Sequence, residues 1–290
     1  MPDMKIPDWI KEKRVDAASL AAMKSLLRSH RLHTVCEEAK CPNIGECFGA
    51  GTATFLVMGD VCTRDCSFCG VRHGTPSPLD PEEPQRIARA AADLNLKHVV
   101  ITSVTRDDLA DGGASHFVQT IDEVRTGNPG CTVEVLVPDF RGDKKAIIRI
   151  LEANPQVFNH NVETVPQLYP LVRHKAVYSA SLEILSLANQ FDRSIITKSG
   201  LMVGLGENMR HVKDVMIDLR ACGVSALTIG QYLRPPGKGL KVRKYYTPSE
   251  FKELENFGYG FGFAHVNSGA FVRSSFHASR ALRKIEETQR

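Results

Sequence analysis

The chain has 290 residues, of which 42% are hydrophobic and 24% charged, a composition typical of a globular protein and not of a disordered or fibrous one. Its 37 basic and 33 acidic side chains give a formal net charge of +4, too small an excess to indicate a nucleic-acid-binding surface. The sequence contains neither an apolar run near the roughly 20 residues of a membrane-spanning helix nor an N-terminal signal peptide. We therefore expect a cytoplasmic protein that binds neither a membrane nor nucleic acid.

The predicted elements begin with a helix and continue as alternating strands and helices. Residues 16–27 have apolar side chains at helical spacing behind Asp16, a candidate N-cap. From residue 52 onward, short apolar runs predict strands at residues 52–58, 98–102, 132–137, 157–161, 198–203 and 227–232. Helical spacing lies between these runs, at residues 82–94, 116–126, 144–152 and 209–221. This alternation is typical of a parallel sheet with crossover helices.

Six such units predict an α/β fold, built either as an open doubly wound sheet or as a partial (β/α)6 barrel. A complete eight-stranded barrel would need more strand–helix units than the pattern supplies. The predicted barrel occupies residues 52–245. Residues 1–51 and 246–290 are then expected to be an N-terminal and a C-terminal extension of that barrel.

The cysteines are distributed unevenly along the chain. Six of the eight lie between residues 36 and 69, whereas Cys131 and Cys222 have no spaced partner. In a reducing compartment, clustered cysteines favour a metal site over disulfide bonds. We therefore interpret the clustered cysteines as metal ligands, and Cys131 and Cys222 as buried, inert thiols.

The last three of the six grouped cysteines have the spacing C-x3-C-x2-C. They are Cys62, Cys66 and Cys69, directly after the first predicted strand. Three thiolates on one short loop can hold three irons of a four-iron cluster and leave the fourth iron without a protein ligand. A small molecule that chelates iron needs such an open position. The structural alternatives are a zinc site completed by His73 and thiols that are merely buried.

This spacing, with an aromatic residue before the last cysteine, resembles the signature of the radical S-adenosylmethionine family. The resemblance implies a partial barrel of that type, a 4Fe-4S cluster held by the three cysteines, and S-adenosylmethionine as cofactor. Active sites of such barrels lie at the carboxyl ends of the strands, which agrees with the position of the motif. The candidates for binding S-adenosylmethionine are Ser103, Asn159, Asn161, Lys198, Gln231 and Leu233. For the Ser and Asn residues, capping of the next helix is the structural alternative.

The first three of the six grouped cysteines have the spacing C-x4-C-x5-C. They are Cys36, Cys41 and Cys47. Three cysteines in a polar loop predict a second metal centre with a fourth ligand that is not cysteine. Thiolate triads select zinc, copper(I) or iron–sulfur clusters, and the neighbouring signature favours a second, auxiliary 4Fe-4S cluster.

The two cysteine motifs in this order resemble the lipoyl synthase family, and the resemblance extends over residues 7–278. The matching stretches are residues 101–113, 136–142, 159–164, 197–207, 230–235 and 272–278. The sequence departs from the family at Phe276, where tyrosine is more frequent. By this resemblance Ser275 is the fourth ligand of the auxiliary cluster, with Ser274 as the close alternative. A helix N-cap is the structural alternative for either serine.

The resemblance implies insertion of two sulfur atoms, at C6 and C8 of an octanoyl chain on a lysine of a lipoyl carrier protein or domain. The auxiliary cluster would donate the sulfur, and a flavodoxin- or ferredoxin-type protein would donate electrons. The basic run of Arg234, Lys238, Lys241, Arg243 and Lys244 is either a docking site for an acidic carrier or a solvated loop. Two other classes remain open at this stage: another sulfur-inserting radical enzyme related to biotin synthase, and a zinc protein that binds nucleic acid.

Overall fold

The computed structural model describes residues 5–10, 17–38, 43, 53–235, 237–276, 278, 282 and 285. Within these residues, eight strands form one sheet in the order β1-β2-β5-β6-β7-β8-β9-β10. The strands are β1 (His33–Thr34), β2 (Thr54–Val57), β5 (His98–Ser103), β6 (Thr132–Leu136), β7 (Val157–Asn159), β8 (Ile196–Val203), β9 (Ala226–Gln231) and β10 (His265–Gly269). Strand β1 pairs antiparallel with β2, and every other pair in the sheet is parallel.

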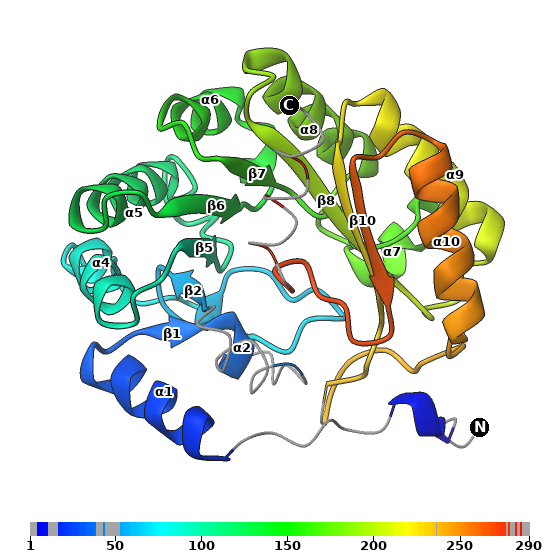
Figure 1. Ribbon diagram of the computed structural model, residues 1–290, viewed down its shortest axis with the longest axis horizontal. Coiled ribbons are helices and arrows are strands. Elements are labelled where there is room, and N and C mark those ends of the chain that lie inside the picture. The colour runs from blue at the N-terminus through cyan, green and yellow to red at the C-terminus, as the bar shows by residue number, and fades with distance from the viewer. Residues whose placement is uncertain are drawn as a thin grey trace.

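Helices cover the outer side of this curved sheet, as Figure 1 shows. They are α4 (Glu83–Asp93), α5 (Ala114–Gly127), α6 (Lys144–Glu152), α8 (Tyr178–Phe191), α9 (Met209–Ala221) and α10 (Pro248–Gly260). Each helix connects two parallel strands and buries one apolar stripe against them. In α6, for example, the buried side chains are Ala146, Ile147, Ile150 and Leu151, which recur at helical spacing.

Further elements lie before β2 and in the loops between the strands and helices of the sheet. Before β2 come η1 (Asp8–Ile10), α1 (Ala17–Ser29) and α2 (Val35–Glu38). The loop after β2 contains the short parallel pair β3 (Val61–Cys62) and β4 (Arg72–His73). Later loops contain η2 (Phe140–Gly142), η3 (Pro166–Leu168) and α7 (Tyr169–Val172). No helix among the described residues has the length and apolar character needed to span a membrane.

The predicted fold class is confirmed, and the six predicted strands correspond to β2 and β5 through β9. The sequence analysis missed α8, α10 and β10. Helix α10 carries a readable signal, because Thr247 and Glu250 form a capping box and Pro248 occupies the first turn. Strand β10 carries little signal, since its sequence His-Val-Asn-Ser-Gly has one fully buried residue, Val266. Residues 248–269, expected to be part of an extension, therefore add a helix and a parallel strand to the sheet.

Candidate metal centre

A cavity of about 1120 Å³ lies at the carboxyl ends of the parallel strands. Its walls include Cys36, all three cysteines of the C-x3-C-x2-C motif, and both Ser274 and Ser275. These residues come from three segments of the chain: α2, the loop after β2, and the loop after β10. The cavity therefore brings described residues of both cysteine motifs and the C-terminal serines to one site.

Hydrogen bonds to neighbouring loops hold the backbone of the C-x3-C-x2-C loop. Thr63 N donates to Thr105 O at 3.0 Å, and Ser67 N donates to Val172 O at 3.2 Å. The Cys62 sulfur accepts two backbone N–H groups, from Arg64 at 3.4 Å and Thr105 at 3.3 Å. These two bonds fix the position of the Cys62 sulfur beside the segment that follows β5. The described cysteines are free thiols, including this triad.

Burial opposes ionisation of the other two thiols in this loop. It raises the pKa of Cys66 above its ordinary value and the pKa of Cys69 to about 11. Thiols in such surroundings lose their protons readily only when a cation binds them, as metal ligands do. Three thiols of one short loop line the same cavity, and this donor set fits a metal cluster.

Arg64 lies within this loop and joins it to two others. Its guanidinium donates two hydrogen bonds to the Asp107 carboxylate, at 2.7 and 2.9 Å, and two to the Asp139 carboxylate, both at 2.7 Å. Burial alone would raise the pKa of Asp139, but the hydrogen bonds and charge of Arg64 outweigh burial and lower it. The Arg64 side chain therefore fixes the loop against the segments that follow β5 and β6.

We expect the Arg64→Gln substitution to lower the free energy of unfolding by about 3 kcal/mol, because it leaves the buried Asp139 carboxylate without its cation. Denaturant unfolding followed by circular dichroism measures this change. The matched control is Arg149→Gln, which breaks a more exposed pair with Asp111 and should change stability little. Equal losses in the two variants would contradict the assignment of the anchoring role to Arg64.

Of the C-x4-C-x5-C motif, predicted to bind the auxiliary cluster, Cys36 belongs to the described residues. Cys36 lies on α2, is buried and lines the cavity. Cys41 and Cys47 lie outside the described residues, so their predicted role stays a prediction. Asn43, between them in sequence, donates a side-chain hydrogen bond to the carbonyl oxygen of Phe271. This contact joins the motif to the segment that carries the two serines.

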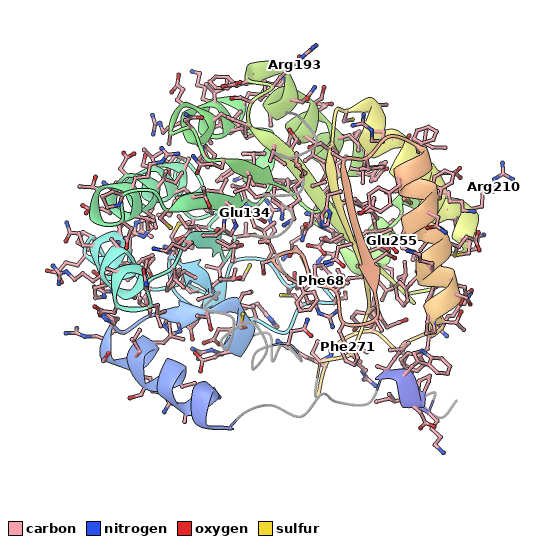
Figure 2. The ribbon with its side chains drawn as sticks, viewed as in Figure 1. Phe68, Glu134, Arg193, Arg210, Glu255 and Phe271 are labelled. Atoms are coloured by element: carbon pink, nitrogen blue, oxygen red, sulfur yellow. The ribbon has the colours of Figure 1, made fainter. Side chains whose placement is uncertain are left out.

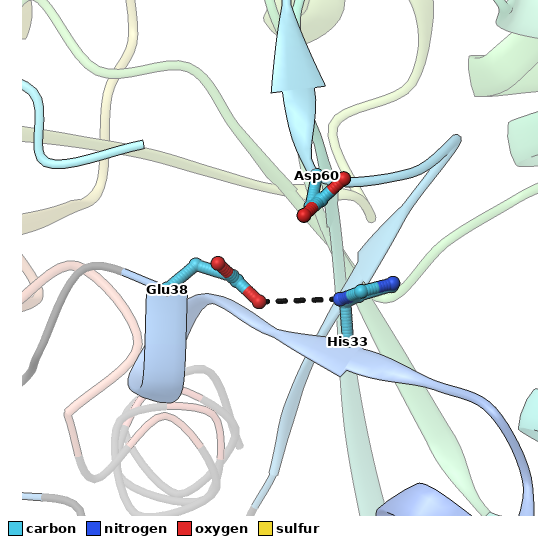
Figure 3. A group of neighbouring side chains, drawn as sticks. All are labelled: His33, Glu38 and Asp60. Atoms are coloured by element: carbon cyan, nitrogen blue, oxygen red, sulfur yellow. Dashed lines mark hydrogen bonds and ion pairs between the residues drawn. The ribbon is translucent and has the colours of Figure 1, made fainter. Parts of the chain in front are cut away.

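A group of polar side chains, His33, Glu38 and Asp60, connects α2 to the turn before β3 (Figure 3). His33 Nδ1 lies 3.1 Å from Glu38 Oε1, and ligand-type atoms of all three residues lie within 4.8 Å of one another. Arg72 pairs with Asp60 and neutralises it. The pairing of His33 with Glu38 and of Asp60 with Arg72 accounts for this group without a metal ion.

Four of the predicted S-adenosylmethionine contacts line the cavity: Ser103, Asn161, Gln231 and Leu233. Ser103 Oγ and Asn161 Oδ1 are buried and have no hydrogen-bond partner within the described structure. Buried polar atoms are rarely left unsatisfied, so these two oxygens indicate a polar ligand in the cavity. The Gln231 amide, in contrast, is occupied by backbone groups of Val203, Tyr232, Lys244 and Tyr246.

The other two predicted contacts, Asn159 and Lys198, are not among the residues that line the cavity. Lys198 Nζ lies 2.8 Å from Glu134 Oε1, and Asn159 Nδ2 donates to the same oxygen at 3.2 Å. All three residues are buried inside the barrel, where Glu134 is the counter-ion of Lys198. The charge of Lys198 and a contact with His98 lower the pKa of Glu134 despite its burial.

The sequence analysis missed Glu163 and Arg173, which also line the cavity. Glu163 is in a left-handed conformation with φ of 65°, and its carboxylate accepts a hydrogen bond from Asn161 Nδ2 at 3.0 Å. Burial raises the pKa of Glu163, whereas the nearby charge of Arg173 acts in the opposite direction. The signal for Glu163 is its place two residues after Asn161, just beyond β7.

Comparison with known proteins decides the family. Residues 56–219 match the model of the radical SAM superfamily, in which SAM denotes S-adenosylmethionine. Lipoyl synthase of Caldanaerobacter subterraneus subsp. tengcongensis is 55% identical over 95% of this chain and 96% of its own length. Lipoyl synthase of Rubrobacter xylanophilus is 53% identical over 94% of this chain and 85% of its own. The chain belongs to the lipoyl synthase family.

This member of the lipoyl synthase family is a radical S-adenosylmethionine sulfurtransferase. Its fold is similar to that of SuiB from Streptococcus suis, solved with bound S-adenosylmethionine, at a TM-score of 0.56. That similarity covers 77% of this chain and 53% of the other, at 11% sequence identity, and so concerns the fold alone. Family membership implies a 4Fe-4S cluster and S-adenosylmethionine as cofactors.

Proposed function

We propose that the chain inserts sulfur at C6 and C8 of an octanoyl group carried on a lysine of a lipoyl carrier protein or domain. The observation that carries this proposal is the convergence in one cavity of Cys62, Cys66 and Cys69 with Cys36 and the C-terminal serines. A radical enzyme that cleaves S-adenosylmethionine and transfers no sulfur needs only the triad of Cys62, Cys66 and Cys69. The further ligands are consistent with a second cluster that serves as sulfur donor.

In this proposal the two sets of ligands hold different clusters. Cys62, Cys66 and Cys69 hold the 4Fe-4S cluster that binds S-adenosylmethionine, and Cys36, Cys41, Cys47 and Ser275 hold the auxiliary 4Fe-4S cluster. When bound, the first cluster supplies the electron that cleaves S-adenosylmethionine to methionine and a 5′-deoxyadenosyl radical, and the second supplies the sulfur. A flavodoxin- or ferredoxin-type protein is the expected electron donor.

The protein's own residues bind and orient S-adenosylmethionine. The unsatisfied oxygens of Ser103 and Asn161 are suited to the polar groups of its methionine or ribose. Arg173 and Glu163 add a cation and an acidic group to the same wall. Asn159 and Lys198 hold the strands beneath this site through Glu134, and we propose for them an indirect effect on cofactor binding.

Apolar side chains supply the rest of the cavity wall and keep water away from the reaction. Phe68 and Phe271, labelled in Figure 2, line the cavity together with Val71, Leu233 and Val242. An eight-carbon acyl chain gains free energy from burial against such a surface. Exclusion of water also protects a carbon radical from side reactions.

Anaerobic iron and sulfide analysis tests the cofactor assignment. Two clusters require about eight irons per chain, four from each. About four irons would remove the auxiliary cluster from the proposal, and one or two zinc ions would contradict the radical mechanism as a whole.

The basic run at residues 234–244 lies partly on the rim of this cavity. Arg234 and Lys238 line the cavity, and Lys241 and Arg243 are exposed. Lys244 is engaged with Glu250 at 2.5 Å, so it contributes less positive charge to the rim than the sequence suggests. The positive charge of Arg234, Lys238, Lys241 and Arg243 in this run supports the proposal that an acidic carrier domain docks at this rim.

Replacing both Lys241 and Arg243 by Gln should lower kcat/KM for the octanoylated carrier about fivefold at low ionic strength, and by much less at high salt. Rim charges mainly accelerate encounter, and salt screens them. The control replaces Lys97 and Arg193, exposed cations that precede β5 and β8 at the opposite end of the strands. The docking proposal fails if a short octanoyl-lysine peptide without acidic residues loses as much activity as the carrier, or if the control pair has the same effect.

A further inference from the structure

The segment after β10 crosses the open side of the partial barrel. Figure 1 shows it returning from the end of β10 towards β2. Strand β10 is at one edge of the described sheet, and β2 is next to the strand at the other edge, β1. The hydroxyl of Thr54, the first residue of β2, donates a hydrogen bond of 2.8 Å to Ser275 Oγ. This side-chain bond therefore joins the two sides of the sheet at the cavity.

The other end of this segment is fixed to β9. A Cβ atom at Gly230 would overlap the carbonyl oxygen of Val272, so the absence of a side chain permits the close approach. Arg273 Nη1 also donates to the carbonyl oxygen of Gln231 at 3.4 Å. Contacts on the β9 side thus set the backbone of the segment, and the Thr54 hydroxyl sets the position of the Ser275 side chain on the β2 side.

Thr54 is well suited to this task. Its side chain is 2% exposed, and as a β-branched residue in a strand it has few accessible rotamers. Thr54 and Leu56 both line the cavity, as expected for alternate residues of one strand. A serine oxygen that accepts a hydrogen bond can bind a metal through another lone pair, because a hydroxyl oxygen has two.

We propose that Thr54 is a positioning residue for the serine ligand of the auxiliary cluster; this inference rests on the proposed function of Ser275. The Thr54 hydroxyl holds Ser275 Oγ towards the cavity and donates to it when it carries negative charge as a metal ligand. Residues that hydrogen-bond to metal ligands typically change metal affinity about 10–100-fold. Thr54 keeps the weakest ligand of the set in place, since an oxygen ligand suits cluster iron less well than thiolate.

The experiment measures iron release from the reconstituted holoenzyme to a ferrous chelator under anaerobic conditions. Formation of 5′-deoxyadenosine in the same samples reports the other cluster, so iron lost without loss of cleavage comes from the auxiliary site. The variants are Thr54→Val, which removes the hydroxyl and keeps the shape, Thr54→Ser, which keeps the hydroxyl, and Ser275→Ala. Thr54→Ala is a second hydroxyl-free variant should valine impair folding.

The matched control is Thr102→Val. Thr102 lies beside Leu56 on the neighbouring strand β5, is 5% exposed, and donates its hydroxyl hydrogen bond to Leu136 O at 2.9 Å. Because this hydroxyl bonds to Leu136 and not to Ser275, Thr102→Val removes a comparable buried hydrogen bond elsewhere in the same wall.

We expect Thr54→Val and Ser275→Ala to release auxiliary iron about tenfold faster than the unmodified chain, and Thr54→Ser and Thr102→Val to resemble it. Fast release from Ser275→Ala with normal release from Thr54→Val would overturn the role of Thr54 and leave the serine ligand intact. Normal release from Ser275→Ala would overturn the ligand assignment itself. If Thr54→Val and Thr102→Val release iron equally fast, loss of any buried hydrogen bond in this wall has the same effect. That result would overturn the inference.

Discussion

Replacing Cys66 by Ala is expected to abolish 5′-deoxyadenosine formation, whereas replacing Cys41 by Ala should leave cleavage of S-adenosylmethionine and abolish lipoyl product. Cys66 belongs to the triad that lines the cavity, and without it the cluster that binds S-adenosylmethionine cannot assemble. The loss should exceed about 100-fold, because residues that merely hydrogen-bond to metal ligands already contribute about 10–100-fold. Chromatography of anaerobic reactions measures deoxyadenosine and lipoyl peptide separately.

Cys131→Ser and Cys222→Ser are the controls for this prediction. Cys131 is buried and Cys222 partly buried, and neither is among the cavity-lining residues. Burial raises the pKa of both thiols, as it does for Cys66 and Cys69, so their place away from the cavity is what favours an inert role. If Cys66→Ala forms deoxyadenosine normally but loses lipoyl product, the assignment of the two triads is reversed. If Cys131→Ser or Cys222→Ser loses a cluster, the replaced cysteine is a further ligand.

The second large effect is expected from Ser275→Ala, which should form deoxyadenosine at a near-normal rate and make almost no lipoyl product. Ser275 accepts the hydrogen bond from Thr54 and lines the cavity. Were Ser275 only a helix cap, its loss would cost about 0.5–2 kcal/mol of stability and would lower both products together. Mass spectrometry of an octanoylated peptide distinguishes unmodified, singly thiolated and lipoylated forms.

Ser274→Ala is the matched variant for this test. Ser274 precedes Ser275 and lines the same cavity, but it is Ser275 that accepts the hydrogen bond from the Thr54 hydroxyl. If Ser274→Ala is inactive and Ser275→Ala makes lipoyl product, the ligand is Ser274. Activity in both variants would refute a serine ligand.

The sequence predicted those features that depend on local spacing. Six strands and four of the helices that follow them could be predicted because apolar runs and helical spacing are properties of a few consecutive residues. The place of Cys62, Cys66 and Cys69 at one site could be predicted for the same reason, since one short loop carries all three. The predicted contacts Ser103 and Asn161 follow from a general rule, that side chains after parallel strands meet at one end of the barrel.

Features that depend on distant pairing could not be predicted. Lys198 was expected at the cofactor, but Glu134, 64 positions earlier in the chain, is its ion-pair partner in the core. The Gln231 amide satisfies backbone groups that only the folded loop at residues 244–246 brings near it. Glu163 turns towards the cavity through a left-handed backbone conformation, which the identity of a glutamate does not indicate.

The most direct test of the account is a single-turnover reaction of the anaerobically reconstituted chain with an octanoylated carrier domain, S-adenosylmethionine and reductant. The account predicts a lipoylated carrier with two sulfur atoms per chain, two deoxyadenosines for each lipoyl group, and loss of auxiliary iron as product forms. Deoxyadenosine formation with an unchanged octanoyl group, or lipoyl formation with the auxiliary ligands Cys36 and Ser275 both replaced by Ala, would contradict it.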